Sequence, residues 1–187
     1  MTALNSTDLR SQISVPRNER LIVALDVADA AEARALVEQL GDSVQFYKVG
    51  MELFMAGGYF ELIDWLGARG KKVFVDLKFF DVPETVRSAI RALAKRNVAF
   101  ATIHGNQAIM EAAGKEKGNL KVLAVTALTS LDRGDLDDLG FNCDIEQLVL
   151  SRARRALESG CDGIISSGLE APLIRQELGP RIMVVTP

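Results

Sequence analysis

Val73-Phe-Val-Asp-Leu-Lys-Phe-Phe-Asp-Val-Pro-Glu-Thr85 is an apolar run that charged residues interrupt. It begins with the β-branched and aromatic residues of a buried strand, yet it carries Asp76, Lys78 and Asp81 before it reaches Pro83. Asp and Lys are rarely buried unless they are paired or take part in chemistry. The run therefore predicts a core strand whose end carries a functional site.

Outside this run, short apolar segments alternate with longer helical patterns. Strands that read as continuous apolar runs are typical of a parallel sheet buried on both faces. Seven repeats of this kind predict a (β/α)8 barrel or a doubly wound sheet. The segment 128–142 breaks the rhythm, and its length and acidity predict a loop. The predicted strands are 21–25, 44–49, 72–76, 98–103, 121–126, 163–166 and 182–185, and the predicted helices are 29–39, 60–68, 84–96, 106–117, 144–159 and 170–178.

The seventh predicted strand is the last before the sequence ends at Pro187. A (β/α)8 barrel typically has about 250 residues, so we expect the eighth strand and the final helices to be absent from this chain. The alternative is a fold that is not a full barrel. We predict a loose N-terminal arm over residues 1–20 and a single barrel domain, incomplete at its C-terminus, over residues 21–187.

Composition excludes several classes of function. The net charge is −3 and the pI about 5.3, which argues against a basic nucleic-acid-binding surface. Cys143 and Cys161 are the only cysteines, and the polar start lacks an apolar signal core, so we expect a reducing, cytoplasmic location. No apolar stretch reaches the roughly 18–20 residues of a membrane span.

The charges around the central strand point to acid–base chemistry. Side chains alternate along a strand, so Asp76 and Lys78 should face the same side, and barrel enzymes place catalytic groups at the carboxyl ends of strands. Carboxylates beside Lys78 would keep it protonated and able to donate a proton. The structural alternative is a simple ion pair, with Asp81 as a helix N-cap and Glu84 completing a capping box.

Two further charges end apolar strands in the same way. Asp26 follows the first predicted strand, and Lys48 lies within the second. Each alone is more often a strand-edge charge. Together with the third strand they predict a cluster of unlike charges at one end of the sheet. The lone histidine, His104, is interpreted as structural.

The motif Asp76-Leu-Lys-Phe-Phe-Asp-Val-Pro-Glu-Thr85 resembles the D-x-K-x-x-D-[IV]-P-x-T signature of the orotidine 5′-phosphate decarboxylase family. Other segments resemble the family's strand ends, namely 22–27, 46–50, 103–105, 125–130, 167–171 and 184–187. The resemblance implies a (β/α)8 barrel, a homodimer with shared active sites, and conversion of orotidine 5′-monophosphate to uridine 5′-monophosphate without cofactor or metal. The family's phosphate-binding Gly-Ile-Arg, Gln and Gly-Arg groups have no counterpart before Pro187.

The resemblance also implies roles for individual residues. Lys78 would protonate C6 of the pyrimidine, and Asp76 would lie near the substrate carboxylate. Asp81 and Thr85 would reach the partner's site, completing a Lys48–Asp76–Lys78–Asp81 array. Asp26 and Lys48 would hold the ribose hydroxyls, and Thr129 would lie against the pyrimidine. The implied catalytic residues are Lys78, Asp76, Asp81 and Lys48, and the implied substrate-binding residues are Asp26, Lys48, Asp76, Leu77, Lys78, Phe79, Phe80, Asp81, Val82, Pro83, Glu84, Thr85 and Thr129.

Two other functions stay open. A related sugar-phosphate lyase or synthase, such as a 3-hexulose-6-phosphate synthase-like enzyme, shares the D-x-K-x-x-D core but uses magnesium and typically lacks the ending that Val82, Pro83 and Thr85 form here. A non-catalytic barrel remnant that binds a nucleotide or a partner chain is the second alternative.

Overall fold

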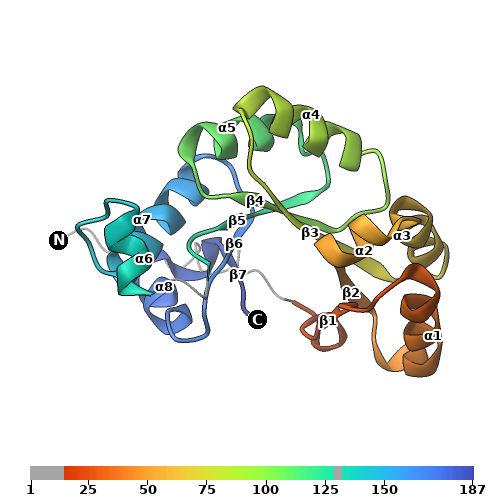
Figure 1. The fold of residues 1–187 in the computed structure, drawn as a ribbon. Coiled ribbons are helices and arrows are strands. Elements are labelled where there is room, and N and C mark those ends of the chain that lie inside the picture. Colours follow the sequence, from red (N-terminus) through yellow and green to blue (C-terminus); the bar gives the residue numbers. More distant parts are fainter. Residues whose placement is uncertain (1–14, 129–131) are drawn as a thin grey trace, which may run out of the picture.

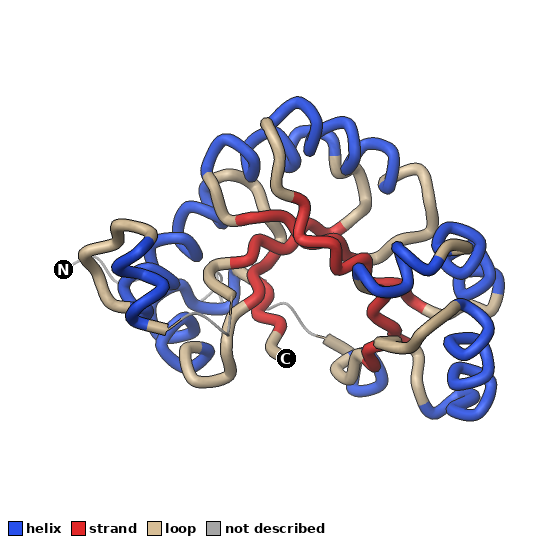
Figure 2. Tube along the Cα trace, in the orientation of Figure 1, coloured by secondary structure: helices blue, strands red, loops and turns tan. Residues whose placement is uncertain are grey.

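One parallel sheet forms the centre of the computed structural model, which describes residues 15–128 and 132–187. Its strands follow one another in chain order, without the reversal that defines a doubly wound sheet. The sheet curls, and the helices lie on its outer side (Figures 1 and 2). This is the barrel arrangement that the sequence predicts. The strands are β1 (Val23–Ala24), β2 (Phe46–Val49), β3 (Lys72–Phe79), β4 (Phe100–His104), β5 (Lys121–Val125), β6 (Gly163–Ile165) and β7 (Met183–Val185).

Eight α-helices occur in the described ranges, six of them close to their predicted positions. They are α1 (Ala30–Leu40), α2 (Met51–Ala56), α3 (Tyr59–Ala68), α4 (Pro83–Leu93), α5 (Gln107–Glu116), α6 (Arg133–Asp138), α7 (Ile145–Glu158) and α8 (Ala171–Leu178). Asp29 caps the start of α1 by accepting hydrogen bonds from the amides of Ala31 and Glu32. Gly41, with φ of 53°, ends the same helix.

The prediction of a loop over 128–142 is wrong for part of that segment. Helix α6 lies within it, and Asp132 and Asp135 form a reciprocal capping box at its start. The helix has a single buried apolar residue, Leu136, so no apolar periodicity marks it in the sequence. Helix α2 was also not predicted. It has only six residues, between β2 and Gly57, and a single buried residue, Leu53, so its sequence shows no helical periodicity either.

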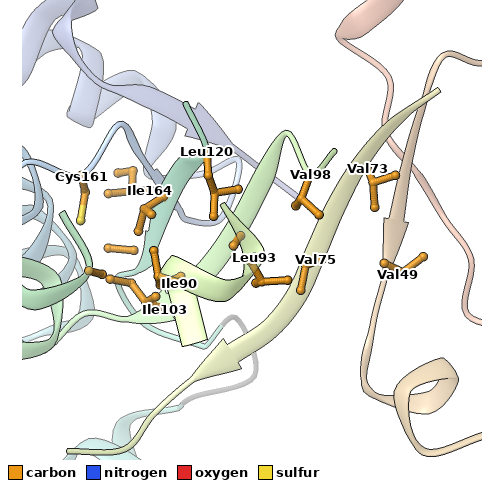
Figure 3. Packing of buried hydrophobic residues seen from close by; sticks show 14 of the residues in the cluster. Val49, Val73, Val75, Ile90, Leu93, Val98, Ile103, Leu120, Cys161 and Ile164 are labelled. Carbon is orange, nitrogen blue, oxygen red and sulfur yellow. The ribbon is translucent and has the colours of Figure 1, made fainter. Parts of the chain in front are cut away.

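Two apolar layers hold the sheet. The larger lies between the strands and the outer helices, where Ile90 and Leu93 of α4 pack beside Val75 and Ile103 (Figure 3). The smaller lies on the inner face and is built on Phe46, Phe74 and Leu123, with Phe100 packed against them. Because side chains alternate along a strand, the residue two places after each inner phenylalanine also faces inward. The positions of these phenylalanines therefore determine which residues line the inner face in the next layer toward the carboxyl ends of the strands.

The sheet has two open edges in the described ranges. Strands β1 and β7 are not paired with each other, and Leu21 and Ile22, just before β1, line a cavity of about 800 Å³ together with residues of β7. Residues 1–14 of the predicted arm lie outside the described residues. Its last part contains a 3₁₀ helix, η2 (Arg17–Glu19), which Glu19 joins to the sheet through a 2.6 Å ion pair with Lys72.

None of the helices in the described ranges is long and apolar enough to span a membrane. Both cysteines are unpaired, and burial raises the pKa of the Cys161 thiol to about 12.

Gly163 tests the packing between neighbouring strands. A Cβ there would lie 2.7 Å from Leu123 Cδ2 and 2.9 Å from the carbonyl oxygen of Met183, whereas a Cβ on the exposed Gly168 would meet no atom within 4 Å. We expect Gly163→Ala to lower the free energy of unfolding by about 1–3 kcal/mol, and Gly168→Ala to change it by less than about 0.5 kcal/mol. Urea denaturation followed by circular dichroism measures both. Equal midpoints for the two variants would contradict this packing.

Candidate active site

The inner faces of three adjacent strands bring Lys48, Asp76 and Thr102 together. Each lies two residues after an inner-face phenylalanine, on β2, β3 and β4 respectively. They therefore lie one layer nearer the carboxyl ends of the strands, which is where parallel barrels place their chemistry. Ion pairs link all four charges that the sequence places at these strand ends, namely Asp26, Lys48, Asp76 and Lys78.

Asp76 is the centre of this cluster. Its Oδ2 lies 3.0 Å from Nζ of Lys78 and 3.7 Å from Nζ of Lys48. Its Oδ1 accepts a hydrogen bond of 2.8 Å from the Thr102 hydroxyl. Only 12% of the Asp76 side chain is exposed, so little water competes for these oxygens. One carboxylate thus faces two ammonium groups with one oxygen and a neutral donor with the other.

Lys48 extends the array to the first strand. Its Nζ also lies 3.2 Å from Oδ1 of Asp26, which is exposed. The charges alternate along the chain of contacts from Asp26 through Lys48 and Asp76 to Lys78. Alternation of this kind lowers the electrostatic cost of placing two ammonium groups in one partly enclosed site.

Thr102 was not predicted to belong to the site. Its hydroxyl accepts a hydrogen bond of 2.9 Å from the backbone amide of Lys78 and donates to Asp76. The side chain is completely buried. Threonine is common in β-strands, so Thr102 does not stand out in an apolar run. The one feature of the sequence that could have pointed to its role is a polar side chain at a position expected to be buried.

Asp81, in the connection after β3, and Thr85, in the first turn of α4, are both exposed, and no hydrogen bond or ion pair joins either of them to the described residues of this array. Asp81 is exposed, and its Oδ1 accepts a 2.6 Å hydrogen bond from the amide of Val82. Helix α4 begins after Val82, which makes no side-chain cap, while Glu84 pairs with Arg87. The alternative of a capping box built from Asp81 and Glu84 is therefore wrong. Pro83 occupies the first turn as expected.

The other predicted site residues divide between the mouth and the outer layer. Phe80 is 64% exposed, and its ring stacks on His104 at 4.3 Å between centroids. Leu77 and Phe79 pack against the outer core cluster. Thr129 lies outside the described residues.

The arrangement can stabilise negative charge and supply a proton. Lys78 is the outermost cation, with 39% of its side chain exposed, so it can meet a ligand at the mouth. Among the described residues, no three His, Cys, Asp or Glu side chains are grouped so that they could hold a metal.

Comparison with known proteins shows the family to which the chain belongs. The family model described as "Orotidine 5'-phosphate decarboxylase / HUMPS family" matches residues 19–187. The chain belongs to this family. An orotidine 5′-phosphate decarboxylase from Methylococcus capsulatus is 66% identical over 92% of this chain and 72% of its own length. Another, from Nitrobacter winogradskyi, is 46% identical over 100% of this chain and 75% of its own.

Solved structures of the family have the same fold. The crystal structure of orotidine 5′-phosphate decarboxylase from Lactobacillus acidophilus matches with a TM-score of 0.84 and 36% identity, covering 89% of this chain and 80% of that one. The resemblance inferred from the motif is confirmed, and with it the enzyme class of the relatives, a decarboxylase that breaks a carbon–carbon bond.

The two tyrosines test burial around the site. Tyr59 donates a 3.0 Å hydrogen bond to the carbonyl of Val49, next to Lys48. Burial, and then the charge of Asp76, raise the pKa of Tyr59, and burial raises the pKa of Tyr47. We expect tyrosinate absorbance from the native protein to appear at a higher pH than from the chain unfolded in guanidinium, whose phenols should both ionise near pH 10.0.

The same shifts predict how stability depends on pH. Both phenols keep their protons longer in the folded state, so their contribution to stability is complete below pH 10.0 and falls as the pH rises above it. Urea denaturation at several alkaline pH values measures this slope. Native phenols that ionise near pH 10 would contradict the burial of these groups.

Proposed function

We propose that this chain converts orotidine 5′-monophosphate to uridine 5′-monophosphate without a cofactor, with Lys78 protonating C6. The supporting observation is the pair of ammonium groups on one carboxylate, with Lys78 Nζ 3.0 Å from Asp76 Oδ2 and Lys48 Nζ 3.7 Å from the same oxygen. The family membership and the relatives' names support the same reaction.

The reaction leaves an electron pair on a ring carbon. The bond between C6 and the carboxylate breaks, carbon dioxide departs, and the electron pair stays at C6. The Lys78 ammonium stabilises this charge and then transfers a proton to C6, leaving a neutral amine that solvent reprotonates. Asp76 holds the ammonium in place beside the departing carboxylate. Lys48 and Asp26 bind the ribose hydroxyls.

We further propose that two copies of the chain share their active sites. Asp81 is exposed and makes no ion pair within the described residues, so it is free to approach the Lys78 of a second copy. Large apolar side chains are also exposed in the connection after β3 and on α2 and α3, which is typical of an interface. They are Met51, Phe54, Met55, Phe60, Phe80 and Val82. A cavity of about 910 Å³, lined partly by Phe54, Phe60 and Phe79, adjoins them.

A cytoplasmic location belongs to the same proposal. Cys143 and Cys161 are both unpaired, which suits a reducing compartment. The magnesium-dependent synthase is the less favoured reaction, because Pro83 and Thr85 complete the decarboxylase form of the motif. A non-catalytic remnant is also less favoured, because it has no need to keep unlike charges in contact in a partly enclosed site.

Replacement of Lys78 tests its role. We expect Lys78→Ala to reduce turnover of orotidine 5′-monophosphate by at least about 10³-fold, since both the proton donor and the cation are removed. Loss of substrate absorbance measures the rate, and calorimetry measures nucleotide binding, which should persist. Lys115→Ala, on the outer helix α5, is the control and should leave turnover unchanged. Near-normal turnover by the Lys78 variant would refute the assignment.

Mixed dimers test the shared site. Lys78→Ala and Asp81→Ala chains should each be inactive alone. After co-refolding they should recover about one quarter of wild-type activity, because half of the randomly formed dimers are mixed and each has one intact site of two. If mass spectrometry shows mixed dimers and activity stays absent, Asp81 does not act across the interface.

A further inference from the structure

We propose that Thr102 is the positioning residue of this active site, and that its hydroxyl holds both the backbone of Lys78 and the carboxylate of Asp76. The inference rests on the proposed function for its effect on turnover. Its structural part stands without it.

Lys78 has an unusual backbone. Its φ is +48°, and it is the one non-glycine residue with positive φ in residues 15–128 and 132–187. The left-handed conformation costs a side-chain-bearing residue about 1–2 kcal/mol. Such a conformation persists only where its surroundings hold it. Something near Lys78 must therefore stabilise it.

The ladder between β3 and β4 does not supply this stabilisation. Pairing is regular from Phe74 to Val75, and the register shifts before it resumes at Phe79 with Ile103. Lys78 lies within this irregular part. Its amide donates instead to the Thr102 hydroxyl at 2.9 Å. A side chain of β4 thus replaces a main-chain partner at the residue whose backbone is strained.

The same hydroxyl sets the orientation of Asp76. A hydroxyl has one proton, and Thr102 gives it to Oδ1 of Asp76 at 2.8 Å. This leaves Oδ2 toward the ammonium groups of Lys78 and Lys48. Thr102 is completely buried, so no bulk water can replace it. One group therefore connects the strained backbone of the proton donor to the carboxylate that holds its ammonium.

Thr102→Val tests this role, because valine keeps the shape and removes the hydroxyl. We expect kcat to fall roughly 10- to 100-fold while KM changes less than about 3-fold, as for a misplaced catalytic group. Thr102→Ser keeps the hydroxyl and should recover most of kcat. Thr126→Val is the matched control, since Thr126 is equally buried and its hydroxyl donates to the Ile165 carbonyl at 2.8 Å. It should lose stability without this loss of kcat.

Hydrogen exchange measured by NMR gives a readout that does not require turnover. The Lys78 amide of the wild-type chain should exchange as slowly as its strand neighbours, and at least about 10-fold faster in Thr102→Val. Wild-type exchange as fast as that of exposed amides would overturn the proposal, even if the valine variant failed to fold. Equal kcat for the Thr102→Val and Thr126→Val proteins would also overturn it. An inactive wild-type chain with a protected Lys78 amide would refute the proposed reaction and leave the positioning role standing.

Discussion

The Asp76 carboxylate is the interaction on which the rest of the site depends. It receives partners from three strands, with Lys48 from β2, Lys78 from β3 and Thr102 from β4. Desolvating a carboxylate is costly, and a single ion pair often fails to offset that cost. Two cations and a hydroxyl together satisfy both oxygens. The curled parallel sheet is what allows side chains from three strands to converge on one group.

The inner apolar layer determines where this convergence occurs. Phe46, Phe74 and Phe100 pack together on the inner face, with ring centroids 4.9 Å apart for Phe46 and Phe100 and 5.9 Å for Phe74 and Phe100. Strand alternation then places Lys48, Asp76 and Thr102 in the next layer. The apolar layer closes the floor of the site, while the mouth stays open at Lys78 and Phe80. The two-residue alternation of the strands thus places both the packed phenylalanines and the polar residues of the site on the inner face.

Strand patterning and the charged motif were enough to predict most of this arrangement. The parallel sheet followed from seven apolar runs, and the contact of Asp76 with Lys78 followed from alternation. The positive φ of Lys78 could not be predicted, because the residue is not a glycine and the break in register depends on the neighbouring strand. The role of Thr102 could not be predicted, because its hydrogen bonds to Asp76 and Lys78 depend on the pairing of β3 with β4. Helix α6 was missed because it depends on a capping box more than on an apolar face.

The proposed reaction is decarboxylation of the nucleotide by this array, with proton transfer to C6. The most direct measurement uses orotidine 5′-monophosphate labelled with ¹³C in its carboxylate, incubated with the purified chain in D₂O and a metal chelator and followed by NMR. Proton transfer to C6 should give labelled bicarbonate and, in equal amount, uridine 5′-monophosphate with deuterium at C6. No release of label, or release only after magnesium is restored, would contradict it.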